Sequence, residues 1–192
     1  AAGAASTTFT LGATSGAHTI TATLNGTAIS TTFTATGSSC VGSALTAAPF
    51  GSGDGSSGTP YLVCTPTQFN QIADNTGYMA KYFLLDADLD MTGVSVSMIG
   101  STTHPFTGTF DGGNHTISNL TITTTADNTA LFSYTGGSSV IKNLNFSTAT
   151  ISAGAHDNVG VVVGYANTTA GTIQNISVTG ATVSGRDYVG GI

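Results

Sequence analysis

The sequence predicts an all-β protein whose main body is a parallel β-solenoid. Threonine, serine and glycine are abundant, glutamate and tryptophan are absent, and helix formers are scarce, which favours strands over helices. One polar interruption of the strand pattern occurs three times, and longer stretches repeat with a period of about 30 residues, a spacing typical of solenoids. Together these observations predict coils that stack on one another.

The interruption lies in short alternating stretches. In HTISNLTI the side chains that favour burial are Ile117, Leu120 and Ile122, so the alternation slips by one residue, and VIKNLNF and TIQNISV show the same slip. The residues at the slip are Asn119, Asn143 and Asn175. Asparagine tolerates the left-handed backbone conformation, so we expect a corner at each position and one hydrogen-bonded ladder of the three side chains. The alternative is three unrelated polar residues within strands.

The longer repeat occupies the C-terminal part of the chain. The stretch ALFSYTGGSSVIKNLNF aligns with VVVGYANTTAGTIQNISV, and ATISAGAHDNVGVVV aligns with ATVSGRDYVGGI. The matched pairs are Leu131 with Val162, Tyr134 with Tyr165, Asn143 with Asn175, Ile151 with Val183, and Val159 with Val189. The β segments within a period lack the two-residue turns that antiparallel pairing favours. We therefore expect successive coils to pair in parallel.

The N-terminal segment, residues 1–37, has a different pattern. Its three alternating stretches lie at 6–13, 17–26 and 28–37. The dipeptide Asn25-Gly26 is a strong signal for a hairpin turn between the last two stretches. A β-sandwich needs about seven strands, so we expect this segment to pack on the rest of the chain or to belong to a larger sandwich.

Residues 38–60 are loop by composition, and the stretch TPTQFNQIADN that comes soon after predicts one helix. We expect Thr65 as the N-cap, Pro66 in the first helical position, and Gln68 as the residue that completes a capping box. The apolar face of this helix consists of Phe69 and Ile72. A short amphipathic helix at this place is expected to cap the first edge of the solenoid.

Cys40 and Cys64 are the only cysteines. As a disulfide they would restrict the unfolded chain and stabilise the fold by about 3 kcal/mol; the alternative is two buried free thiols. The charge-poor, threonine-rich surface suits an extracellular setting, in which disulfides persist.

Charged residues make up 6% of the chain, which has a net charge of −6 and nine acidic residues, all aspartate. The basic residues are Lys81, Lys142 and Arg186. We therefore expect neither nucleic acid nor an anionic membrane surface as a partner. No apolar run approaches the ~18 residues that span a bilayer, and no signal segment opens the chain, which predicts a soluble, mature or excised piece.

The motifs PFTGTFDGGNHTISNLTI, IKNLNF, NVGVVVGYA, GTIQNISVTGATVSG and YVGGI, in this order, resemble the GLUG-repeat region of large bacterial surface proteins. SGTPYLVCTPTQFNQIAD and YFLLDADLDMTG resemble the lead-in to such repeats, so the similarity covers residues 50–192. It implies a right-handed parallel β-helix with surface-exposed, adhesin-like architecture. VGVVVG departs from the family by a valine where a second glycine is common. YVGGI stops within a motif, which predicts that the natural chain continues beyond Ile192.

Residues 6–37 are similar to the last third of a bacterial immunoglobulin-like repeat of intimin and invasin stalks, with His18 where that family often has tyrosine. The predicted organisation has three parts. These are a partial immunoglobulin-like segment at 1–37, a linker and cap at 38–79, and a parallel β-helix at 80–192.

Three groups of residues are candidates for chemistry. Asp86, Asp88 and Asp90 share one face of a strand and could bind calcium through carboxylate oxygens; the alternative is hydrogen bonding at turns and strand ends. The other two groups are His104 with Asp111 and His115, and His156 with Asp157. Neither has an evident activated nucleophile, so we expect a turn and a solvated loop. Apart from calcium, no cofactor is expected.

Two polar sequence patterns suggest functions, ice binding and glycosylation, that the sequence does not otherwise support. Thr-x-Thr pairs, as in TITATL and TITTT, suggest ice binding by a flat threonine surface. In the sequence, however, these pairs do not repeat with the solenoid period. Sequons for N-glycosylation occur at Asn25, Asn114, Asn119, Asn145, Asn167 and Asn175, and a chain rich in asparagine, threonine and serine produces them by chance.

The predicted function is that of a non-enzymatic structural segment of a secreted surface adhesin or fibre, self-assembling through strand complementation. Its partners would be further copies or neighbouring domains. One alternative is a module that binds a glycan or host surface through loops 153–158 and 166–171. A polysaccharide-active enzyme is the third alternative, for which the sparse basic residues offer little support.

Overall fold

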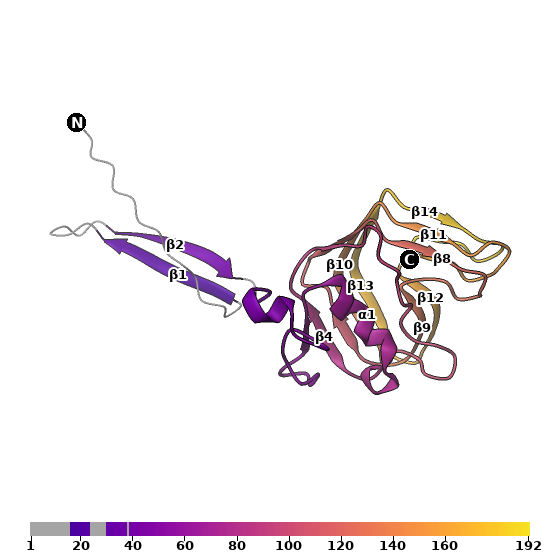
Figure 1. Ribbon diagram of the computed structural model, residues 1–192, viewed down its shortest axis with the longest axis horizontal. Coiled ribbons are helices and arrows are strands. Elements are labelled where there is room, and N and C mark those ends of the chain that lie inside the picture. Colours follow the sequence, from indigo (N-terminus) through magenta and orange to yellow (C-terminus); the bar gives the residue numbers. More distant parts are fainter. Residues whose placement is uncertain (1–15, 24–29, 38) are drawn as a thin grey trace.

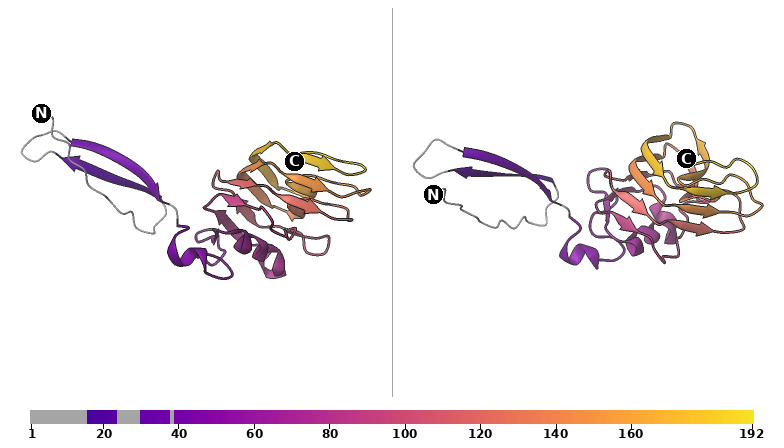
Figure 2. Two further views of the ribbon diagram at one scale, coloured as in Figure 1. Left: turned by 45° about the horizontal axis from the view of Figure 1, so that its top comes forward. Right: turned by 90° about the horizontal axis from the view of Figure 1, so that it is seen from above.

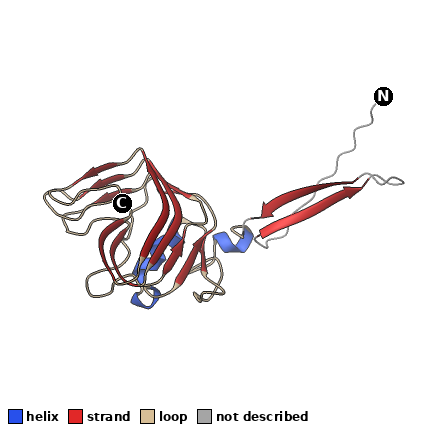
Figure 3. Ribbon diagram, turned by 180° about the vertical axis from the view of Figure 1, so that it is seen from behind, coloured by secondary structure: helices blue, strands red, loops and turns tan. Residues whose placement is uncertain are grey.

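The main body of the protein is a parallel β-helix, as predicted, and a two-stranded hairpin precedes it (Figures 1 and 2). The computed structural model describes residues 16–23, 30–37 and 39–192, with side chains described from residue 39 onward. Strands and loops make up the coils, and the helical segments are confined to the chain that precedes the second strand of the β-helix (Figure 3).

The hairpin forms a sheet of its own. It consists of β1 (Gly16–Thr23) and β2 (Ser30–Gly37), which pair antiparallel with Thr23 opposite Ser30. This pairing confirms the two predicted strands at 17–26 and 28–37. The predicted strand at 6–13 and the Asn25-Gly26 turn lie outside the described residues.

Three parallel sheets form the β-helix. The largest contains, in spatial order, β3 (Tyr61–Val63), β4 (Tyr82–Leu85), β6 (Thr109–Asp111), β10 (Val140–Ser147), β7 (Thr116–Ser118) and β5 (Leu89–Asp90), and β13 (Thr172–Thr179) also pairs with β10. The second contains β14 (Thr182–Ser184), β11 (Thr150–Ser152) and β8 (Thr121–Thr123), and the third pairs β12 (Val163–Thr168) with β9 (Phe132–Gly137). Strand β10 begins on β6 and ends on β7, because the preceding coil turns between those two shorter strands.

The register between coils confirms the sequence alignment. Tyr134 pairs with Tyr165, Ile151 with Val183, and Val159 bridges to Val189. The period of the sequence is therefore the length of one coil. Strand β3 already pairs in parallel with β4, so the segment assigned to the cap supplies the first strand of the largest sheet.

One continuous apolar core runs through the coils and includes the helix α1 (Pro66–Asp74). Phe69 and Ile72 of α1 are fully buried, and the Phe69 ring meets Phe110 of β6 edge-on, with 5.7 Å between ring centroids. Ile141 in β10 is buried, whereas its partner Ile173 in β13 is 41% exposed. The helix therefore closes the core at the end from which the chain enters the β-helix.

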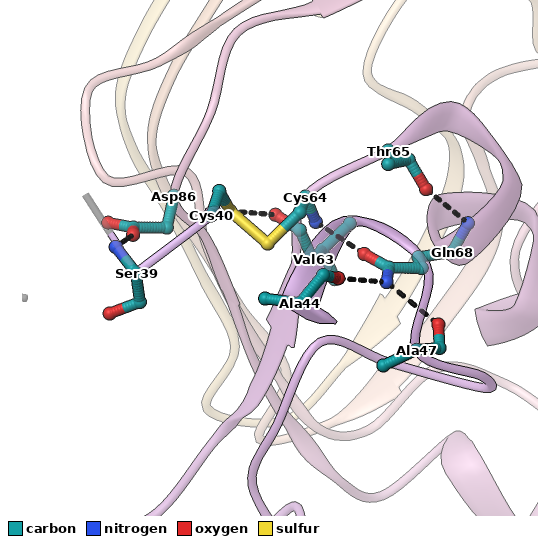
Figure 4. The surroundings of a disulfide bond; sticks show 9 residues. All are labelled: Ser39, Cys40, Ala44, Ala47, Val63, Cys64, Thr65, Gln68 and Asp86. Atoms are coloured by element: carbon teal, nitrogen blue, oxygen red, sulfur yellow. Dashed lines mark hydrogen bonds between the residues drawn. A yellow bond between two sulfur atoms is a disulfide. The ribbon is translucent and has the colours of Figure 1, made fainter. Parts of the chain in front are cut away.

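The beginning of α1 is fixed by side chains as well as by backbone. Thr65 is the N-cap and its Oγ1 accepts from the Gln68 N–H at 3.2 Å, as predicted. The Gln68 side chain does not complete the capping box. Its Oε1 accepts from the Cys64 N–H at 2.8 Å, and its Nε2 donates to the carbonyl oxygens of Ala44 and Ala47 (Figure 4). The buried glutamine thereby ties α1 to the preceding loop, which contains the 3-10 helix η1 (Gly42–Leu45).

Cys40 and Cys64 form the predicted disulfide, with 5.3 Å between their Cα atoms, so the free-thiol alternative is wrong. Both cysteines belong to a second small apolar cluster with Ala44, Leu62 and Leu84. Cys64 immediately precedes the helix N-cap, and a further 3-10 turn, η2 (Thr76–Tyr78), comes after the helix. The crosslink therefore joins the segment after the hairpin to the capped end of the β-helix.

Candidate functional site

The most regular polar features of the β-helix are columns of side chains at its corners. At the first corner Asn143 and Asn175 both have left-handed backbone conformations, with φ of 55° and 52°. Asn175 Nδ2 donates to Asn143 Oδ1 at 3.0 Å, and Asn143 Nδ2 donates to Asp111 Oδ1 at 2.9 Å. Side-chain hydrogen bonds thus link three successive coils, beginning at an aspartate.

The prediction that Asn119 joins this ladder is wrong. Asn119 has a φ of 56°, but it lies at a second corner, where its Nδ2 donates to Asp90 Oδ1 at 2.9 Å and its Oδ1 accepts from Thr148 Oγ1 at 2.8 Å. Between paired positions, two residues of β10 stand opposite the four residues 112–115 of the preceding coil. The two Ile-x-Asn-Leu patterns read alike but occupy different corners, because register places Asn119 opposite Thr148, five residues after Asn143 in the same coil.

A third corner was missed by the sequence pattern. Asn128, Asn158 and Tyr188 have φ of 59°, 58° and 54°, and Asn158 Nδ2 donates to Asn128 Oδ1 at 2.9 Å. Each comes directly after an aspartate and precedes a residue that bridges to a neighbouring coil. The recurring Asp-Asn and Asp-Tyr dipeptides are the signal that could have located this corner.

Asp111 combines a corner hydrogen bond with an ion pair. Its Oδ1 also accepts from the Gly113 N–H at 3.0 Å, and its Oδ2 lies 3.0 Å from Lys142 Nζ. Partial burial acts to raise the pKa of this carboxyl, but the hydrogen bonds from Asn143 and Gly113 and the ammonium of Lys142 outweigh burial and hold the pKa below its usual value. Asp111 is therefore ionised at neutral pH.

The structure does not gather Asp86, Asp88 and Asp90 around a common point. Asp86 Oδ2 accepts from the Ser39 N–H at 2.6 Å, as Figure 4 shows. Asp88 Oδ1 accepts from the Thr116 N–H at 2.9 Å, and Asp90 bonds at the second corner. Within the described residues, no group of three or more histidine, cysteine or acidic side chains is placed to hold a metal. The observed geometry is the hydrogen-bonding alternative to a calcium site.

The two predicted histidine groups are also dispersed. His115 Nδ1 lies 3.0 Å from Asp88 Oδ1 on the preceding coil rather than against Asp111, and His104 Nδ1 contacts the hydroxyl of Thr103. The three residues around HPFTGTFDGGNH therefore belong to separate local networks.

His156 makes an inter-coil pair of the same kind. Its Nδ1 lies 3.2 Å from Asp127 Oδ1, which also accepts from the Asp157 N–H at 2.9 Å. Asp157 accepts from Arg186 Nε at 2.8 Å, and this bond lowers the pKa of Asp157. In the part of the chain that is described, no hydroxyl group hydrogen-bonds to Nε2 of His115 or His156, so neither pair extends to a nucleophile.

Hydroxyl side chains form two rows across the second sheet, and the sequence alone did not predict these rows. In the second sheet, register places Thr121, Thr150 and Thr182 in one row, and Thr123, Ser152 and Ser184 in the next. The Thr-x-Thr pair of β8 is therefore followed by Thr-x-Ser pairs in the next two coils, so Thr-x-Thr itself does not repeat, as predicted, but a pair of hydroxyl residues does. Two residues of the second row are serines, which lack the methyl group of threonine, and the result is a hydroxyl surface rather than an array of threonines.

The asparagines of the N-glycosylation sequons differ in whether their side chains form hydrogen bonds. Three of the asparagine side chains donate to partners on neighbouring coils, namely Asn119, Asn145 and Asn175. Asn114 and Asn167 are exposed and have no side-chain hydrogen bond among the described residues. Asn25 lies outside the described residues.

Comparison with known proteins gives two similarities. The chain is 33% identical over 162 residues to halomucin from Haloquadratum walsbyi, which is 79% of this chain and about 2% of the length of halomucin. A solved structure from Bacteroides ovatus, assigned provisionally as an immunoglobulin A1 protease, matches with a TM-score of 0.53 and 26% identity over 69% of this chain and 41% of that one. No protein-family model matches the sequence. No helix in the described ranges is long and apolar enough to cross a bilayer.

Proposed function

We propose that this chain is a non-enzymatic structural segment of an extracellular surface protein, with the β-helix serving as a stiff rod. The observation that carries the proposal is the coupling between coils. The apolar core, the parallel backbone ladders and the corner columns all connect each coil to the next. In a solenoid, such contacts between neighbouring coils supply much of the stability, and they continue from coil to coil along the axis.

The similarity to halomucin supports a surface setting, because its name describes a mucin-like protein. This chain corresponds to a small part of that relative, which suits a segment of a long surface molecule. The disulfide agrees with an oxidising compartment. The assignment to GLUG-type repeats of an adhesin-like protein, preceded by part of an immunoglobulin-like repeat, belongs to this proposal.

Assembly through strand complementation is the finer part of the proposal. The hairpin of β1 and β2 is a two-stranded sheet, which is marginally stable alone. Its backbone edges would gain stability from a strand supplied by another copy or by a neighbouring domain. Further copies of this chain are therefore the partners that we expect.

Electron microscopy of the native material, and of the purified chain with and without residues 1–37, tests both parts. We expect subunits joined in a polymer whose repeat equals one subunit, and loss of the polymer but not of the folded subunits when residues 1–37 are removed. Isolated rods without a repeat would contradict strand complementation. Native material with no elongated particles would contradict the rod, whereas the purified chain, with few coils spaced about 4.8 Å apart, is itself compact.

Proteolysis is the competing activity, because the Bacteroides ovatus neighbour is assigned provisionally as a protease. The histidine–aspartate pairs of His115 and His156 bridge coils through Nδ1, which is a structural use of both groups. Incubation of the purified chain with immunoglobulin A1 should leave the antibody intact. Cleavage that disappears in His115→Ala or His156→Ala would make the chain an enzyme.

A further inference from the structure

A groove of about 400 Å³ lies on the outer surface of β4, β6 and β10. Register sets two rows of side chains along it. The first row is Tyr82, Thr109 and Val140, and the second is Leu84, Asp111 and Lys142. Ser57 and Pro60 line the groove from the loop that precedes β3. The predicted glycan-binding loops, 153–158 and 166–171, take no part in it.

The loop beside the groove is held in place by its own hydrogen bonds. Asp54 Oδ1 accepts from Thr59 Oγ1 at 2.7 Å and from the Ser56 N–H at 2.9 Å, and these bonds lower the pKa of Asp54 to about 2. The Tyr82 N–H donates to the Gly55 carbonyl oxygen at 3.1 Å, which fixes the loop to β4. Both sides of the groove are therefore preformed, as in most sites for small ligands.

The lining combines one aromatic surface with one donor and one acceptor. Tyr82 is 39% exposed, so its ring is available for stacking. Among the described residues, the hydrogen-bond partner of Lys142 Nζ is Asp111 Oδ2, which leaves two N–H groups to donate to a ligand. Asp111 Oδ2 can accept a second bond, and the opposite charges of Lys142 and Asp111 cancel.

We infer that this groove binds a neutral oligosaccharide. The C–H face of a pyranose ring packs on an aromatic ring, while its hydroxyls need donors and acceptors at the rim, and the two rows supply these side by side. Neighbouring strands are about 4.8 Å apart, so three strands offer a length that matches two sugar rings. The cancelled charge disfavours an acidic or a basic ligand. This binding function goes beyond the structural role and does not depend on it.

The test is a glycan array of neutral and acidic oligosaccharides probed with the whole chain, followed by titration of the ¹⁵N-labelled chain with the neutral glycans that bind. We expect amide shifts confined to β4, β6, the first half of β10 and the loop at 53–59. Tyr82→Ala should weaken binding at least about tenfold, whereas Tyr82→Phe should retain it. Lys142→Met should also weaken binding, because a charged donor is lost.

Tyr165→Ala is the matched control, since Tyr165 is similarly exposed, at 44%, but lies on β12 outside the groove. Its binding should equal that of the parent chain, and the amide spectrum of every variant reports whether it folds. Absence of any neutral glycan among the bound ligands would overturn the inference. So would preferential binding of acidic glycans, or amide shifts that Tyr82→Ala and Tyr165→Ala reduce equally.

Discussion

Asn143 meets two requirements at one position. Its φ of 55° lies in the left-handed region, and its side chain bonds to Asp111 on one side and to Asn175 on the other. Leucine would be strained in this conformation and would lose both bonds. Asn143→Leu should therefore lower the free energy of unfolding by about 2 kcal/mol or more, as measured by urea denaturation.

The matched control is Asn145→Leu in the same strand. Asn145 Nδ2 donates to the Asn114 carbonyl oxygen at 2.8 Å, but Asn145 has no positive φ. We expect Asn145→Leu to cost about 1 kcal/mol. Equal losses for the two variants would show that the left-handed corner contributes nothing.

Gln68 is the one buried amide that serves three backbone groups among the described residues. It is 2% exposed and bonds to the N–H of Cys64 and to the carbonyl oxygens of Ala44 and Ala47. Gln68→Leu should cost about 3 kcal/mol, because those groups would stay buried without partners. Gln71→Leu, which removes an exposed contact with Asp74, should change stability by less than about 0.5 kcal/mol. Comparable losses in thermal unfolding would contradict the bridging role of Gln68.

Asp111 makes stability depend on pH. Its pKa is lower in the folded chain than in the unfolded chain, so its contribution is fully present above the unfolded value of about 3.9 and is lost as the pH falls through the folded value. Asp111→Asn should flatten the decline in unfolding free energy between about pH 5 and pH 2. A decline as steep as that of the parent chain would contradict this assignment.

Local patterns could predict left-handed corners but not their neighbours. The phase slip at Asn119 and Asn143 depends only on adjacent residues, so it is legible in the sequence. Their hydrogen-bond partners, Asp90 and Asp111, lie on other coils, so which residue becomes the partner depends on the number of residues between corners in each coil. The Gly112-Gly113 stretch changes that number in one coil. Register places Asn119 opposite Thr148, five residues after Asn143, so the two asparagines belong to different columns.

At the scale of elements, the disulfide and α1 form one cap. Reduction of Cys40–Cys64 removes a constraint of about 3 kcal/mol on the unfolded chain. Hydrogen exchange after reduction should show loss of protection in residues 39–47 and in α1 before any loss in β10 and β13. Simultaneous loss in both regions would mean that the cap and the coils unfold as one unit.

The helix was the most predictable element, since Thr65 and Pro66 are local signals and both act as expected. The failed capping box has a tertiary cause. The loop at 44–47 offers two carbonyl oxygens to Gln68, and the Cys64 N–H lies within reach of its Oε1. The two bonds to the loop span more than 20 residues of sequence, and no local pattern records them.

At the scale of the whole molecule, stability should grow with the number of covered coils. Ile141 and Ile173 are register partners, but only Ile141 has a coil on both sides, and Ile173 is 41% exposed. Ile141→Ala should cost about 3 kcal/mol, and Ile173→Ala about 1 kcal/mol or less. Chemical denaturation of the two variants measures this gradient, and equal losses would contradict it.

The period of the sequence predicted the stacking of coils because each coil repeats the same burial pattern. The groove could not be predicted, since Tyr82 and Lys142 are 60 residues apart and meet only through the registers of β4, β6 and β10. The repeat of Thr-x-Thr and Thr-x-Ser pairs in the second sheet was overlooked because serine replaces threonine in later coils.

The disulfide also defines a load path. A pull on the hairpin reaches Cys40 and then crosses the sulfur atoms directly to Cys64, one residue before the N-cap of α1. The loop between the two cysteines lies outside this path and carries no tension. We therefore expect force to enter the β-helix at its capped, crosslinked end, and the groove-lining loop at 53–59 to keep its shape while the chain is stretched.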